Sequence, residues 1–263
     1  MEAATAIFYG QNLVTGDRTV RLRNVVIHEI AHQWWGNAVT ENDWDDVWLS
    51  EGFATYFTLL FIEHADGRDA FVAGLRDSQR RVRDFSLKNP DYRIVHDNLD
   101  DMRQVTTGQI YQKGGWTLHM LRGIVGDEPF RAGIREYYRR YRNANASTAD
   151  FRRVMEEAAG QPLGWFFDQW LTRGTYLTVD GGWRYDAARR TIEIDLAQTQ
   201  DGPLVDMPIE IGVTAADRPA GRVERVRLRE RRQRFTIVSD TEPSAVTLDP
   251  NVWVLMDVSF ARW

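Results

Sequence analysis

Two histidines, His28 and His32, stand four residues apart, and a glutamate, Glu51, follows after eighteen intervening residues. In a helix of about 3.6 residues per turn, positions i and i+4 project from nearly the same side, so both imidazoles can face one ion. Two imidazole nitrogens and one carboxylate oxygen are ordinary zinc ligands, and three protein ligands leave a fourth position open for water. Glu29, next to His28, can reach that water without being a ligand, which suits a general base. The spacing therefore predicts a zinc site.

The same residues also fit a solvated helix face or a pair of hydrogen-bonded core histidines. The neighbours of His28 favour the zinc site, because Val26, Ile27 and Ile30 are apolar and predict a buried helix. Two unpaired imidazoles in a buried helix would cost free energy that a bound metal offsets. Glu51 also opens a second apolar stretch, so the third ligand comes from the start of a helix.

Two predicted helices carry these residues. The first runs from Asp17, as its N-cap, to Trp34, and Gly36-Asn37 ends it. The second runs from about Ser50 to Ala65 and places Glu51 in its first turn, where the helix dipole favours a carboxylate. A strand-like run is expected over residues 1–9 and an irregular segment over 92–107. Three further helices are expected over residues 68–87, 109–125 and 129–141. Another helix is expected to begin at Ser147, with Asp150 as its capping-box partner. A last helix is expected over residues 163–172, with Pro162 in its first turn.

After Gly174 the hydrophobic period changes. Residues 191–196, 225–229 and 235–238 alternate apolar and polar side chains, which is typical of half-buried strands. Turn signals recur at Gly181-Gly182, at 201–203 and at 249–251, and this spacing predicts a small β-sandwich. The sequence therefore predicts an α+β protein, with a helical metal-binding domain over residues 1–174 and an all-β sandwich domain over 175–263.

Several other residues can take part in the chemistry. Asp46 is our candidate for the carboxylate that accepts the second ring N–H of a metal-bound histidine, although a solvated loop acid is an equally open alternative. Tyr111 can donate to a developing oxyanion beside a metal, although a tyrosine in an apolar helix is more often part of the core. Taken by itself, Glu2 is expected to be an ordinary acidic residue near the terminus. The remaining histidines lack ligand spacing and are expected on the surface or packed in the core: His64, His96 and His119.

The composition of the 263 residues excludes some classes of protein. A formal net charge of −5 and a pI near 5.6 give no sign of nucleic-acid binding. The chain has no cysteine, which rules out disulfides and thiolate ligands. We expect no transmembrane segment, because no apolar run is long enough, and the compartment stays open between cytoplasmic and exported.

The chain resembles the aminopeptidase N family of zinc metallopeptidases, the gluzincin aminopeptidases, in the segments HEIAHQWWGNAVT and DDVWLSEGFATYF. In that family HExxH is followed after eighteen residues by Glu in a WLNEGFA-like stretch, where Ser50 here replaces Asn. The family's Tyr-x-Lys-Gly motif is similar to residues 111–114, and its Gly-x-Met-Glu-Asn motif is similar to Met1-Glu2, with Ala3 in place of Asn. The resemblance implies a thermolysin-like zinc peptidase domain followed by a β-sandwich domain, and it covers the whole chain.

The resemblance also implies a mechanism for removing the first residue of peptides that have a free N-terminus. Glu29 takes the proton of the attacking water and later delivers it to the leaving amine, and Tyr111 stabilises the oxyanion. Glu2 pairs with the α-ammonium of the peptide. One zinc ion per chain is held by three ligands: His28, His32 and Glu51.

In the family a large N-terminal β-domain and several strands precede the Gly-x-Met-Glu motif, whereas this chain begins inside it. We therefore expect the C-terminal part of a longer, N-terminally truncated enzyme that binds zinc but hydrolyses peptides poorly without the missing region. Two alternatives are an epoxide hydrolase on the same site and a catalytically silent, zinc-stabilised scaffold. The presence of Glu29 and Tyr111 favours the aminopeptidase, because a scaffold needs neither.

Overall fold

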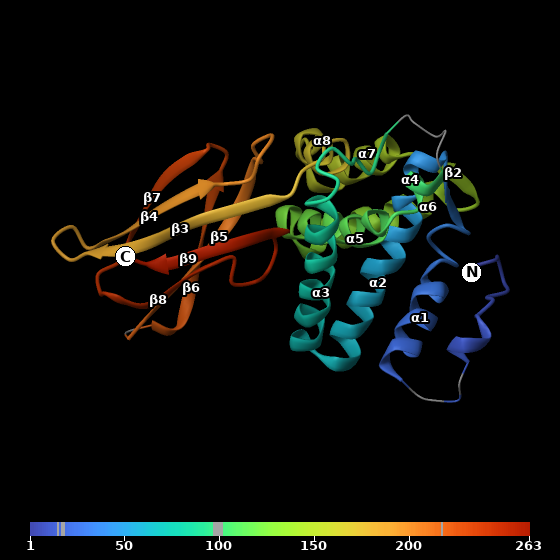
Figure 1. Ribbon diagram of the computed structural model, residues 1–263, viewed down its shortest axis with the longest axis horizontal. Helices are drawn as coiled ribbons and strands as arrows, with labels where there is room; N and C mark the ends of the chain where they lie inside the picture. Colours follow the sequence, from blue (N-terminus) through green and yellow to red (C-terminus); the bar gives the residue numbers. More distant parts are fainter. Residues whose placement is uncertain (15, 17–18, 97–101, 217) are drawn as a thin grey trace. The chain divides into compact units, whose positions relative to one another are not determined.

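The computed structural model describes residues 1–14, 16, 19–96, 102–216 and 218–263 (Figure 1). The chain divides into two compact units, Met1–Gly174 and Thr175–Trp263. The first unit is mainly helical and the second is built from strands, so the predicted α+β class is confirmed. Within the described ranges, no helix is both long enough and apolar enough to cross a membrane.

Helices dominate the first unit. A short parallel pairing joins β1 (Val39–Glu41) to β2 (Ala144–Ala146), and 3-10 turns lie at Gln11–Leu13 and Trp44–Asp46. The described α-helices are α1 (Val20–Ala31), α2 (Trp48–Asp66), α3 (Arg68–Ser86), α4 (Met102–Val105), α5 (Gly108–Val125), α6 (Asp127–Tyr141), α7 (Thr148–Ala159) and α8 (Gly164–Leu171).

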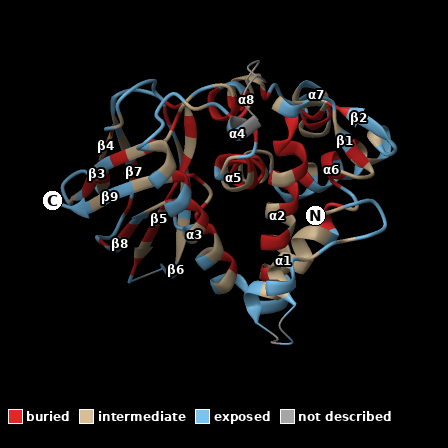
Figure 2. Cartoon of the chain, turned by 45° about the vertical axis from the view of Figure 1, so that its right-hand side comes forward, coloured by how far each residue is buried: buried red, intermediate tan, exposed pale blue. Residues whose placement is uncertain are grey.

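Helices α2 and α5 pack closely in the interior of this unit, and most residues of α5 are buried (Figure 2). Two glycines set their separation. A Cβ on Gly52 would lie 2.9 Å from the carbonyl carbon of Gly114, and a Cβ on Gly114 would lie 3.1 Å from the Cα of Gly52. Phe53, the next residue of α2, contacts the rings of Tyr137 and Phe151 in the aromatic core. The glycine contact therefore brings the first turn of α2 close to the first turns of α5.

The start of α7 confirms the predicted capping box. The Ser147 side chain accepts a hydrogen bond from the backbone N–H of Asp150, and the Asp150 carboxylate accepts one from the backbone N–H of Ser147. The prediction for α8 is less accurate, because Leu163 is its N-cap and Pro162 therefore precedes the helix rather than lying in its first turn.

Helix α1 is shorter than predicted at its C-terminus. It begins after Thr19, whose hydroxyl accepts a hydrogen bond from the N–H of Leu22, and it ends at Ala31 rather than at Trp34. Asp17, the predicted N-cap, lies outside the described residues. The predicted strand over residues 1–9 is wrong, because the backbone turns there and the N–H of Ala6 bonds to a carbonyl three residues earlier.

The described strands of the second unit form two sheets, with orders β7–β4–β3–β9 and β6–β5–β8. The predicted alternation over residues 191–196 is confirmed, because Ile192, Ile194 and Leu196 are buried and the residues between them are not. One apolar face on each sheet is typical of a β-sandwich. The strand bounds are β3 (Leu177–Asp186), β4 (Thr191–Gln198), β5 (Met207–Ala215), β6 (Arg218–Leu228), β7 (Arg232–Val238), β8 (Pro243–Leu248) and β9 (Met256–Arg262).

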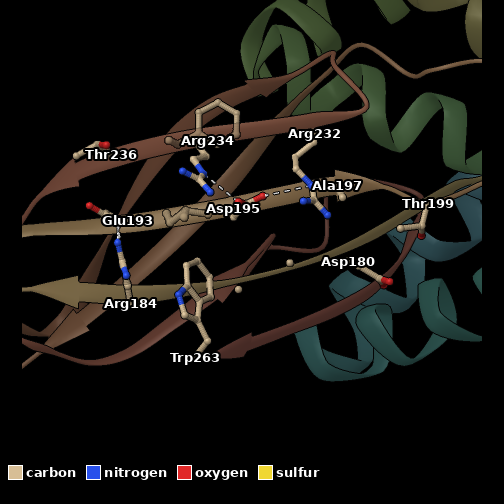
Figure 3. A pocket seen from close by; sticks show the side chains of 14 residues that line it. Asp180, Arg184, Glu193, Asp195, Ala197, Thr199, Arg232, Arg234, Thr236 and Trp263 are labelled. Carbon is tan, nitrogen blue, oxygen red and sulfur yellow. Dashed lines mark hydrogen bonds and ion pairs between the residues drawn. The ribbon is translucent and has the colours of Figure 1, made fainter.

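The polar face of the β7–β4–β3–β9 sheet has a hollow of about 550 Å³ (Figure 3). Arg184 pairs with Glu193 across this face. The predicted turn at Gly181-Gly182 is wrong, because both glycines lie inside β3. A Cβ on either glycine would come within 2.3 Å of a backbone oxygen of a neighbouring strand, that of Asp195 or Ala261. Glycine in this strand therefore allows neighbouring backbones to approach closely rather than forming a turn.

Candidate metal centre

Helices α1 and α2 bring the three predicted ligands together. Nε2 of His28 and Nε2 of His32 lie 3.1 Å apart, and each lies 3.1 Å from Oε2 of Glu51. His28 is in the last turn of α1, His32 is the C-cap residue that follows it, and Glu51 is in the first turn of α2. Three potential donor atoms therefore form a nearly equilateral triangle.

The hydrogen bonds of His32 orient its ring. Its Nδ1 lies 2.9 Å from the carbonyl oxygen of Trp35, so the Nδ1–H donates to that oxygen and Nε2 keeps its lone pair toward the triangle. The hydroxyl oxygen of Ser50 lies 3.2 Å from the same Nδ1. Gly36 permits this arrangement: its φ of 114° is in the left-handed region, and a Cβ there would lie 2.7 Å from the Ser50 hydroxyl oxygen.

The donor set fits a zinc ion. Donors bound tetrahedrally to zinc at about 2.0–2.1 Å lie roughly 3.3 Å from one another, close to the spacing of these three atoms. Burial lowers the pKa of His32, but the hydrogen bond and charge of Glu51 raise it by more. Burial raises the pKa of Glu51, yet the hydrogen bonds of His28 and His32 outweigh burial and hold that pKa at about 2. The carboxylate is therefore ionised, as a metal ligand must be.

Glu29 and Glu2 lie close enough to share one cation. Oε2 of Glu29 accepts a hydrogen bond of 2.9 Å from the ammonium of Met1, and the same nitrogen is 3.8 Å from Oε2 of Glu2. The side chain of Glu29 is only 14% exposed, whereas that of Glu2 is 38% exposed. The backbone carbonyl of Glu2 accepts a hydrogen bond from Nδ2 of Asn37.

Tyr111, in the first turn of α5, reaches the same site. Its hydroxyl donates a hydrogen bond of 2.9 Å to Oε1 of Glu51, the oxygen that does not contact the histidines. Its ring stacks at 6.1 Å from the ring of His28. Burial, followed by the charge of Glu51, raises the pKa of Tyr111, so the phenol keeps its proton and remains a donor.

The prediction that Asp46 orients a histidine is wrong. Oδ1 of Asp46 instead accepts hydrogen bonds from the backbone N–H and the hydroxyl of Thr148, at 2.8 and 2.6 Å. The same hydroxyl oxygen accepts a bond from the indole N–H of Trp48, so Asp46 ties the loop before α2 to the start of α7. The acceptor of His32 is instead the backbone carbonyl of Trp35. The sequence could not reveal this partner, because every residue type has a backbone carbonyl.

The other three histidines lie away from the triangle of donors. His119 is fully buried in α5, with its Nδ1 3.2 Å from the hydroxyl of Tyr56. His64 is exposed in the last turn of α2. His96 is half-buried and its ring lies near that of Tyr92.

An α+β protein that presents His-Glu-x-x-His on one helix, with a glutamate donor on the next, has the features of the zinc peptidase class. Residues 1–170 match the peptidase family M1 domain. The chain therefore belongs to peptidase family M1.

Several known proteins are similar to this chain. Glutamyl aminopeptidase of Mus musculus is 31% identical over 213 residues, which cover 80% of this chain and 22% of that protein. Probable aminopeptidase 2 of Sulfurisphaera tokodaii is 30% identical over 188 residues, covering 68% of this chain and 24% of the other. A crystal structure of Legionella pneumophila aminopeptidase A in complex with aspartic acid shares the fold, with a TM-score of 0.73 and 19% identity over 91% of this chain and 27% of that one. The chain thus spans about a quarter of the length of these proteins.

Proposed function

We propose that this chain carries the catalytic centre of a zinc-dependent aminopeptidase, which removes the first residue from peptides with a free N-terminus. The supporting observation is the triangle of donor atoms, each 3.1 Å from the others, with a glutamate and a protonated tyrosine beside it. The names of the relatives, which are aminopeptidases, agree with this proposal.

Each residue of the site has a role in this reaction. A zinc ion held by His28, His32 and Glu51 would supply the Lewis acidity that activates water and polarises a carbonyl. Glu29, on the same helix as the histidines, would accept the proton of the water and deliver it to the leaving amine. The hydroxyl of Tyr111 would donate to the carbonyl oxygen as negative charge develops there.

Glu2 would limit cleavage to the first peptide bond. Its side chain is 38% exposed, so an ammonium from solvent can reach it. A substrate α-ammonium bound to Glu2 would place the first peptide bond beside the site and exclude longer N-terminal extensions.

The test measures zinc content and hydrolysis of an aminoacyl reporter substrate for the parent chain, Glu29→Gln and a control. Glu128→Gln is the matched control, because Glu128 is an exposed glutamate in the first turn of α6. We expect about one zinc per chain in all three proteins. Turnover should fall by about a hundredfold or more in Glu29→Gln only, which is the size of a lost general base.

Other results would change the proposal. Zinc binding without turnover in any of the three proteins would favour the alternative of a zinc-binding module. Absence of zinc from the parent chain would refute the metal centre itself. An equal loss of turnover in both variants would refute the role of Glu29.

A further inference from the structure

The two histidines of the metal centre are held to different degrees. The side chain of His32 is only 1% exposed and has hydrogen-bond partners at both ring nitrogens, whereas that of His28 is 19% exposed. Within the described part of the chain, the hydrogen bonds of His28 all involve Nε2, so its Nδ1 has no partner there. The protein therefore orients the ring of His32 more tightly than that of His28.

Ser50 supplies the second of two acceptors at Nδ1 of His32. A carbonyl oxygen only accepts hydrogen bonds, so the Trp35 oxygen at 2.9 Å requires a proton on Nδ1. The hydroxyl oxygen of Ser50, 3.2 Å from the same nitrogen, then accepts from that N–H as well. A ring with a single acceptor can swing about the direction of its hydrogen bond, whereas two acceptors that converge on one nitrogen restrict this motion. The lone pair of Nε2 thus stays aimed at the other two donors of the triangle.

The position of Ser50 is itself fixed. It is 5% exposed and lies in the first turn of α2, directly before Glu51. Gly36 packs against its hydroxyl, since a Cβ there would lie 2.7 Å from the Ser50 oxygen and 3.3 Å from Nδ1 of His32. Helix α2 therefore provides one ligand and, from the preceding residue, an acceptor that orients a second ligand.

We propose that Ser50 is a positioning residue of the metal centre, which raises the affinity for zinc by holding the imidazole of His32 in its ligating orientation. The inference rests on the zinc centre of the proposed function and not on the peptidase reaction. The Trp35 carbonyl by itself satisfies the buried N–H, so the hydroxyl contributes to metal binding rather than to folding. Partners that orient a metal-bound histidine typically contribute about tenfold to a hundredfold in metal affinity.

The test compares the zinc affinities of the parent chain, Ser50→Ala and Ser78→Ala by competition with a chelator. Ser78 is the matched control, because it is a serine of α3 that is 3% exposed and whose hydroxyl lies 3.5 Å from the carbonyl oxygen of Gln112 rather than beside a ligand. We expect Ser50→Ala to bind zinc at least about tenfold more weakly, and Ser78→Ala to bind it as the parent does. Parental affinity in Ser50→Ala, or an equal loss in both variants, would overturn the proposal.

Two further measurements distinguish positioning from a structural role. Zinc-free Ser50→Ala should melt within about 2 °C of the zinc-free parent, and a melting temperature several degrees lower would refute the proposal, because the weaker zinc binding would then follow from impaired folding. The visible absorption of the cobalt(II)-loaded chain reports the coordination geometry of the ion. This spectrum should change in Ser50→Ala and stay parental in Ser78→Ala, and an unchanged spectrum in Ser50→Ala would refute the role in positioning.

The outcomes also separate this inference from the peptidase activity. Weaker zinc binding in Ser50→Ala, without reporter turnover by any of the proteins, would support the role of Ser50 and refute the aminopeptidase. Turnover that depends on Glu29, together with parental zinc affinity in Ser50→Ala, would support the aminopeptidase and refute the role of Ser50. A parent chain that binds no zinc would refute both.

Discussion

Replacing Gly52 with alanine should force α2 and α5 apart. A Cβ at this position would lie 2.9 and 3.0 Å from two backbone carbons of Gly114 and 3.3 Å from the backbone nitrogen of Gly115. Carbon atoms in ordinary contact are about 3.5–4.0 Å apart, so the helices must separate locally by roughly 0.5–1 Å. Backbone atoms cannot rotate out of the way as a side chain can.

Two opposing contributions set the size of the effect. Overpacking a core typically costs about 1–3 kcal/mol, whereas alanine in place of glycine inside a helix stabilises by about 1 kcal/mol. The free energy of unfolding of the helical unit should therefore fall by up to about 2 kcal/mol. For a unit of this size that change lowers the melting temperature by up to roughly 8 °C. Because Glu51 is the adjacent residue, the affinity for zinc should fall as well.

The assay is thermal unfolding followed by far-UV circular dichroism, with zinc affinity measured by competition with a chelator. Gly108→Ala is the matched control, since Gly108 opens α5 and a Cβ there would meet nothing within 4 Å. The control should melt at the parental temperature or above. If Gly52→Ala melted as high as Gly108→Ala and bound zinc as tightly as the parent, the close approach of α2 and α5 would not be what positions the metal centre.

Three further predictions follow from the site. Tyr111→Phe should lower kcat by about 10²–10³ without changing zinc content, because it removes one donor to the oxyanion; a parental kcat would contradict this role. Asp46→Ala should lower the free energy of unfolding by about 1–2 kcal/mol in urea titrations, since the N–H of Thr148 loses its acceptor, and zinc affinity should stay parental. In the folded, zinc-free chain the hydrogen bonds of the histidines hold the pKa of Glu51 at about 2, below the ordinary value of 4.5 for a glutamate in the unfolded chain. The ionised carboxylate therefore stabilises the fold above about pH 4.5, and this stabilisation is lost as the pH falls toward 2. Urea unfolding over that range should show the decline, and Glu51→Gln should remove this part of it.

Local sequence was sufficient for features that depend on periodicity or on neighbouring residues. The four-residue spacing placed His28 and His32 on one face of a helix, since helix geometry repeats regardless of what packs around it. The capping box of Ser147 and Asp150 and the alternation along β4 were predictable for the same reason. The membership of peptidase family M1, first indicated by the HExxH motif and its spaced glutamate, also depends on such local motifs.

Tertiary structure decided how each side chain is used. Asp46 and Glu41 are both acids that lie in the sequence between His32 and Glu51. Asp46 accepts a hydrogen bond from the N–H of Thr148 at the start of α7, whereas Oε2 of Glu41 is buried without a hydrogen-bond partner. The acceptor that orients His32 is a backbone carbonyl of Trp35, which every residue type possesses. By itself, then, the sequence determined which chemical groups the chain carries and which of them share a helix face. The partner of each group, and whether it has one, depended on packing between segments distant in the sequence, because hydrogen bonding and burial are set by every element that surrounds an atom.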